Sequence, residues 1–175
     1  MPLTAYTRLS SYPVSDELTG QFAAHLNLLA GEYTPGELSL FLRSAASFLE
    51  RETGRVYFPG EYKVLAAMQR ESRLVLPLYP VTHLVECVLD FGSTLPGALV
   101  YDGGRYLFDA GVRITGSIEL TVAAGYTDAF PAPECYLAAI FAVAADLYEH
   151  RESQSERQLY DNKTLKFILD NLRCY

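Results

Sequence analysis

The chain has 175 residues, of which half are apolar and a fifth are charged, a balance typical of one soluble, folded domain rather than of a disordered segment. Its formal charge of −7 argues against a protein whose main task is to bind nucleic-acid phosphates, because that affinity comes largely from Lys and Arg. The sequence shows neither a run of about 18 apolar residues nor the start of a signal peptide, so it predicts no membrane span and no secretion.

The first third of the chain has helical spacing. Residues 1–14 predict an extended N-terminal arm. Ser15 can cap a first helix, and a second begins at a capping box in which Thr34 and Glu37 can each satisfy a free backbone amide. Residues 15–54 therefore predict two helices, the second stopped by its terminal glycine.

From residue 55 to residue 124 the period of the apolar residues changes to about two, and Gly and Pro separate short runs. Such a pattern is typical of an antiparallel meander or a small sandwich. The expected strands are Tyr62 to Met68, Arg73 to Leu76, His83 to Phe91, Ala98 to Tyr101, Tyr106 to Asp109 and Ser117 to Ala123.

The last of these strands leads into the helix around which the chain is expected to be organised. Gly125 releases the backbone, and an apolar stripe at helical spacing then predicts a helix over 133–151. A polar stretch follows, and residues 155–175 predict a C-terminal helix and tail. The stripe of this last helix consists of Leu165, Ile168, Leu169 and Leu172.

Together these elements predict an α+β fold in a single domain spanning 1–175. We expect a helical bundle of about four helices with an antiparallel β-insertion, residues 55–124, between the second and third helices.

The sequence carries no recognisable catalytic, cofactor or metal motif. Cys135 lies in the first turn of a predicted helix, where a thiol can be activated, but no motif supplies a base, so we expect a small buried residue. The histidines His25, His83 and His150 lie in separate elements without metal-ligand spacing. The turn at 102–104, Asp-Gly-Gly, predicts a hairpin rather than a phosphate or calcium loop. The three cysteines, Cys87, Cys135 and Cys174, lack CxxC spacing and predict reduced thiols.

Three patches in this order resemble the head–tail connector (adaptor, or head-completion) proteins of long-tailed double-stranded-DNA bacteriophages. One is a helix that closes on Thr-Gly-Arg at 53–55. Another is the Leu-Pro-x-x-Pro-Val start of a strand within 76–81. The third is Ala-Gly-Tyr at 124–126, followed by Pro-Ala-Pro and a helix that ends in Tyr-Glu. The residues that carry the resemblance are Gly54, Arg55, Pro77, Gly125, Tyr126, Pro131, Pro133, Tyr148 and Glu149.

The resemblance implies a structural subunit of the virion neck, assembled in the host bacterial cytoplasm, and not an enzyme. Such a subunit forms a ring, usually of twelve copies, beneath the portal protein, extends the DNA channel and joins the filled head to the tail or stopper. The implied partners are other copies, the portal and a tail or stopper protein, without cofactors, membranes or specific DNA binding. The stripe of the C-terminal helix, with Tyr175, is a candidate portal-docking surface. The alternatives are a tail-side neck protein such as a tail terminator, and a small enzyme or toxin with an unrecognised site.

Overall fold

The computed structural model describes residues 4–90, 92–149 and 170 of the chain. These residues gather in two compact units, each built from two stretches of the sequence. Residues 4–11 and 54–130 form a sheet unit, and residues 12–53 and 131–149 form a helical unit. That the chain is one domain stays a prediction.

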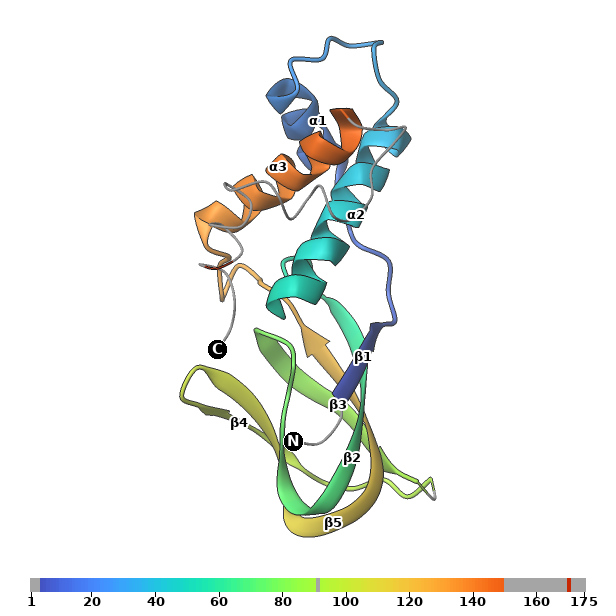
Figure 1. Ribbon diagram of the computed structural model, residues 1–175, viewed down its shortest axis with the longest axis vertical. Coiled ribbons are helices and arrows are strands. Elements are labelled where there is room, and N and C mark those ends of the chain that lie inside the picture. Colours follow the sequence, from blue (N-terminus) through green and yellow to red (C-terminus); the bar gives the residue numbers. More distant parts are fainter. Residues whose placement is uncertain (1–3, 91, 150–169, 171–175) are drawn as a thin grey trace. The chain divides into compact units, whose positions relative to one another are not determined.

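The sheet unit contains five antiparallel strands, labelled in Figure 1. Their order is β1-β2-β5-β3, and β4 pairs with β5 at one end. Two long strands, β2 and β5, lie side by side at the centre. The strands are β1 (Thr4–Arg8), β2 (Gly60–Val75), β3 (Val81–Leu89), β4 (Ala98–Asp102) and β5 (Arg105–Ala124).

Alternation along the two central strands sorts their side chains into a buried face and an exposed face. Ile118, Leu120 and Val122 of β5 are fully buried, as are the facing residues Tyr62 and Val64 of β2. On the opposite face, the ammonium of Lys63 in β2 lies 2.7 Å from the carboxylate of Glu119 in β5. The core of this unit is therefore made mainly by one face of its own sheet.

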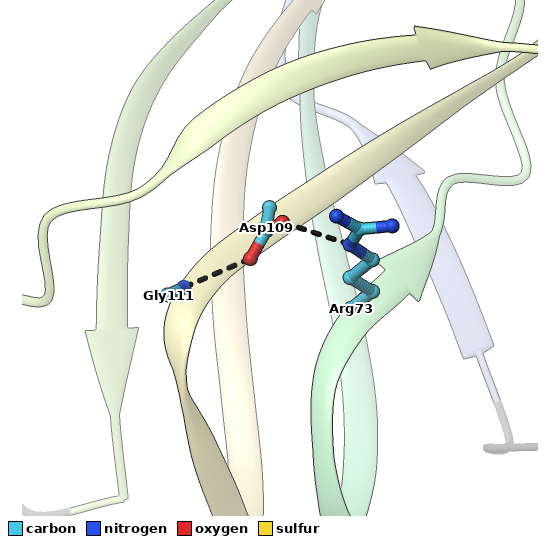
Figure 2. Close-up of polar contacts among 3 residues, drawn as sticks. All are labelled: Arg73, Asp109 and Gly111. Carbon is cyan, nitrogen blue, oxygen red and sulfur yellow. Dashed lines mark hydrogen bonds and ion pairs between the residues drawn. The ribbon is translucent and has the colours of Figure 1, made fainter.

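Figure 1 shows β2 and β5 bending together at one end of the sheet. Arg70 of β2 has a positive φ of 58°, and the register between the two strands shifts on either side of Glu71. Figure 2 shows the side chains that meet beyond the bend: Arg73 Nε donates to Asp109 Oδ2 at 2.8 Å, and the backbone N–H of Gly111 donates to Asp109 Oδ1 at 2.9 Å. The Gly111 amide and then the Arg73 guanidinium hold the pKa of Asp109 below its usual value of 3.8.

The helical unit contains α1 (Asp16–His25), α2 (Pro35–Thr53) and α3 (Glu134–Glu149). Ser15 caps α1 as predicted, because its hydroxyl accepts the N–H of Leu18 at 3.1 Å. Both α1 and α3 pack on α2. The fully buried side chains at these contacts include Phe22, Leu38, Leu42, Leu49, Tyr136, Ile140 and Ala144.

The predicted fold class is wrong in its architecture. A five-stranded antiparallel sheet is the principal element, and the described residues contain three helices rather than a four-helix bundle. The sheet is also not an insertion between the second and third helices, because β1, from the segment predicted as a free arm, pairs with β2 before any helix begins. The predicted fourth helix lies outside the described residues.

Candidate assembly surfaces

Parts of all three patches that carried the family resemblance come together in the sheet unit. The N–H of Tyr79 donates to the carbonyl of Gly54 at 2.8 Å, and the carbonyl of Tyr79 accepts the N–H of Val56 at 2.8 Å. The N–H of Gly125 donates to the carbonyl of Pro80 at 2.9 Å. We call residues 54–56, 77–80 and 124–126 the motif junction. Segments more than 20 residues apart in sequence thus meet at one end of the sheet.

Arg55 joins the three parts of the motif junction through its side chain. Its Nη1 donates to the hydroxyl of Tyr126 at 2.8 Å, and its guanidinium carbon lies 5.1 Å from the ring centroid of Tyr79. A guanidinium over an aromatic face is attracted by the ring electrons, and its planar shape also allows a directional hydrogen bond. Lysine could not make both contacts equally well.

Two glycines of the motif junction are required by its geometry. Gly54 has a φ of 69°, and a Cβ there would lie 2.8 Å from the carbonyl oxygen of Pro77. Gly125 has a φ of 125°, and its Cβ would lie 2.6 Å from the Cα of Pro59. Because the obstacles are backbone atoms, a larger residue would force the chain segments apart. Close packing of the backbone therefore requires glycine at both positions.

An aromatic patch surrounds Tyr79. Its ring centroid lies 6.5 Å from that of Tyr101, 5.8 Å from Tyr106, 6.4 Å from Tyr126 and 5.9 Å from Phe130. Burial, followed by the hydrogen bond to Tyr101, raises the pKa of Tyr79 to about 12, so its hydroxyl stays protonated at neutral pH. Tyr101 and Phe130 are 57% and 40% exposed. Large aromatic side chains presented in this way are typical of protein interfaces.

The remaining family residues lie in the helical unit. Pro133 directly precedes α3, and its carbonyl accepts the N–H of Tyr136 at 2.9 Å. Tyr148, near the end of the same helix, makes an edge contact with Phe41 of α2, with ring centroids 5.6 Å apart. The candidate portal-docking residues Leu165, Ile168, Leu169, Leu172 and Tyr175 all lie outside the described residues.

A groove between α2 and α3 was not expected from the sequence. Its volume is about 460 Å³, and its floor is apolar. Arg43 and Arg51 lie on one face of α2 and line it; Arg51 also lies over the ring of Phe48, with 5.8 Å between the guanidinium carbon and the ring centroid. The other lining residues are Ser44, Ser47, Val143 and Leu147. The sequence feature that could have indicated this groove is the spacing of the two arginines, which lie eight residues apart on a predicted helix.

The residues considered for chemistry are dispersed. Cys135 is an exposed free thiol, so the expectation that it is buried is wrong, whereas Cys87 is buried. The ring of His25 stacks on that of Phe22, with centroids 6.4 Å apart, and makes a tilted contact with Phe141, with centroids 5.5 Å apart. The turn after Asp102 joins β4 to β5, which confirms the predicted hairpin. Across the described part of the chain, no group of three or more His, Cys, Asp or Glu could hold a metal ion.

No described helix is both long and apolar enough to cross a membrane. No protein-family model matches the chain, and no curated protein sequence matches it significantly.

The fold, in contrast, is found in solved particle structures. A chain in the neck of an empty gene transfer agent (GTA) particle, computed with C6 symmetry, matches with a TM-score of 0.74 and 19% sequence identity, over 98% of this chain and 96% of that chain. A chain in the neck of the native GTA particle, computed with C12 symmetry, matches with a TM-score of 0.73 and 19% identity, over 98% and 96%. This chain shares its fold with these neck chains, and we call the shared fold the neck-protein fold. The predicted resemblance to head–tail connector proteins is thereby confirmed at the level of the fold.

A chain in the virion of the native gene transfer agent shares this neck-protein fold, with a TM-score of 0.73 and 18% identity over 97% of this chain and 95% of that chain. The match spans nearly the whole of each chain, so it covers the sheet unit and the helical unit alike. The shared fold therefore includes both units.

Proposed function

We propose that this chain is a structural, non-enzymatic subunit of the neck of a tailed, DNA-filled particle. It lies beneath the portal, extends the DNA channel and joins the filled head to the tail or to a stopper protein. The observation that carries this proposal is the match, over nearly the whole length of both chains, to chains from two particle necks.

The neck subunits form a closed ring of twelve copies. The support for a ring is that the two similar necks were computed with C6 and C12 symmetry. A cyclic assembly needs two different, complementary faces on each subunit, because every copy contacts its two neighbours in the same head-to-tail way. The aromatic patch offers one surface suited to such burial.

The ring lets DNA pass without specific binding. Residues 12–53 and 131–149 hold nine Asp or Glu but only two Arg and no Lys. A surface of this kind repels phosphates, so DNA can slide past it rather than adhere. The acidic charge is concentrated in the helical unit, since residues 54–130 hold eight Asp or Glu and six Lys or Arg. We therefore expect the helical unit to contribute acidic side chains to the wall of the channel.

The C-terminal segment docks on the portal. Its predicted helix of about ten residues is too short to be stable alone in water, so its stripe must be buried against something. The competing possibility is that this stripe packs on the helices of its own subunit.

The function is tested by assembling particles without this chain. We expect filled heads and free tails that do not join, seen by negative-stain electron microscopy, and joining restored when the chain is supplied in trans. Normal joined particles in its absence would refute the neck function. Empty heads that never package DNA would place the chain at an earlier step than the one proposed.

A further inference from the structure

The groove between α2 and α3 is the basic site of an otherwise acidic unit. Arg43 and Arg51 are the only Lys or Arg residues in 12–53 and 131–149, and both line this groove. Arg51 Nε lies 3.5 Å from Glu52 Oε1 in an ion pair that leaves the Arg51 side chain 60% exposed. Phe48, Val143 and Leu147 make the surface between the arginines apolar. The groove therefore fits a ligand with an apolar tip beside a carboxylate.

The turn between α1 and α2 presents such a tip. Leu29 is 70% exposed, more than any other large apolar side chain of the described residues. Its backbone N–H donates to Glu32 Oε2 at 2.7 Å, its carbonyl accepts the N–H of Glu32 at 3.1 Å, and Gly31 supplies the positive φ of 96°. These bonds hold an exposed leucine and a carboxylate side by side. Because the turn is already closed in the free subunit, little conformational entropy is lost on docking.

We propose that the Leu29 turn, residues 29–32, of one copy docks in the α2/α3 groove of the next copy around the ring. Leu29 lies on the apolar floor, and the Glu32 carboxylate faces the arginines, where charge-assisted hydrogen bonds are stronger than neutral ones. The contact is heterologous, since turn and groove are different surfaces, and this is the geometry that a closed ring requires. The inference rests on the proposed ring and names one of its interfaces.

The turn does not fill the groove of its own subunit. It precedes α2, whereas the groove begins at Arg43, eight residues after the helix starts at Pro35. At a rise of about 1.5 Å per residue, these points lie roughly 12 Å apart along the helix axis.

Charge argues against two other occupants. The predicted C-terminal helix carries Lys163, Lys166 and Arg173, which have the same sign as the arginines of the groove. Nucleic acid is disfavoured because nine carboxylates in the same unit repel phosphates. A second copy brings both the apolar tip and the opposite charge.

The test is thiol crosslinking in assembled particles. The full chain carries Leu29→Cys and Ser47→Cys in a background with Cys135→Ser and Cys174→Ser, and is treated with a short bismaleimide. Because the contact repeats around the ring, we expect a ladder of covalent oligomers, about tenfold above the single-cysteine variants, since docking raises the local thiol concentration. The matched control pairs Ser47→Cys with Leu65→Cys, a position 48% exposed on the sheet, and should give no ladder. Adding Arg43→Ala and Arg51→Ala should reduce the ladder.

Three outcomes would overturn the inference. One is a ladder no stronger than that of the control pair. Another is crosslinking that stops at dimers, which would indicate a two-fold contact. The third is crosslinking within one chain between Ser47→Cys and Cys174, in a companion variant that keeps Cys174 and lacks Leu29→Cys, which would place the C-terminal segment in the groove. A neck ring seen by electron microscopy without this ladder leaves the proposed function standing and refutes only the inferred contact; if no ring is seen, the proposed ring fails with it.

Discussion

At the scale of single residues, Gly125 holds the motif junction together because it has no side chain. A Cβ there would meet backbone atoms of Pro59, and its φ of 125° is unfavourable for other residues. We expect Gly125→Ala to lower the free energy of unfolding by about 1–3 kcal/mol or more, measured by urea denaturation. Gly20 in α1 is the control, since a Cβ there meets nothing within 4 Å. Gly20→Ala should stabilise the chain by up to about 1 kcal/mol. Equal effects of the two substitutions would contradict the packing of the junction.

Asp109 provides a test of the polar contacts at the bend of the sheet. Its folded pKa is lowered below 3.8 by the Gly111 amide and the Arg73 guanidinium. A lowered folded pKa contributes stability above the unfolded value, and this contribution is lost as the pH falls through the folded pKa. We expect an NMR titration of the Asp109 carboxyl to give a midpoint below 3.8 in the folded chain, and Arg73→Ala to raise it. A midpoint that does not move in the variant would show that the pair in Figure 2 contributes nothing in solution.

At the scale of elements, the two faces of the central strands should respond differently to the same substitution. Leu120 of β5 is fully buried, whereas Leu65 of β2 is 48% exposed on the same sheet. Leu120→Ala should cost about 2–5 kcal/mol because it leaves a cavity in the core. Leu65→Ala should change the free energy of unfolding by only about 0.5 kcal/mol, as is usual for surface positions. Comparable losses in thermal and urea denaturation would mean that the strand register is different.

The same elements show what the sequence could predict. The helices were predictable because each has an apolar stripe bounded by a cap, a glycine or a proline, signals that depend on neighbouring residues. The strands were predicted too short, since Gly111, Gly116 and the residues near Arg70 suggested strand ends. In the structure these residues instead lie inside β2 and β5, at positions of positive φ or shifted register. Strand β1 was missed because Thr4–Arg8 is short and has little apolar alternation, and its structure comes from pairing with β2.

The candidate surfaces were only partly predictable, because they too depend on contacts between residues that are distant in the sequence. The resemblance singled out Arg55 and Tyr126 separately, yet their hydrogen bond depends on strand pairing across 71 positions of the chain. The α2/α3 groove could be suspected from the spacing of Arg43 and Arg51, but its depth depends on how α3 packs. Leu29 falls within the range 15–54 that predicted two helices, but it is exposed in a turn, because α1 ends at His25.

At the scale of the whole molecule, truncation of the C-terminal segment tests whether this segment is buried against the portal or against its own subunit. We expect a chain that ends at Asp161 to keep its melting temperature within a few degrees but to produce heads that do not join tails. The reason is that the stripe from Leu165 to Leu172 would be buried against the portal rather than against its own subunit. A large fall in melting temperature, measured by differential scanning calorimetry, would show that the segment belongs to the core of its own subunit.

The central claim is that this chain forms a ring in the neck of the particle. The most direct measurement is a cryo-electron microscopy reconstruction of the neck without imposed symmetry, from particles that carry this chain. We predict a closed ring beneath the portal, with twelve copies of the sheet unit and helical unit around the DNA channel. A neck density into which this fold cannot be placed, or a symmetric dimer elsewhere in the particle, would contradict the claim.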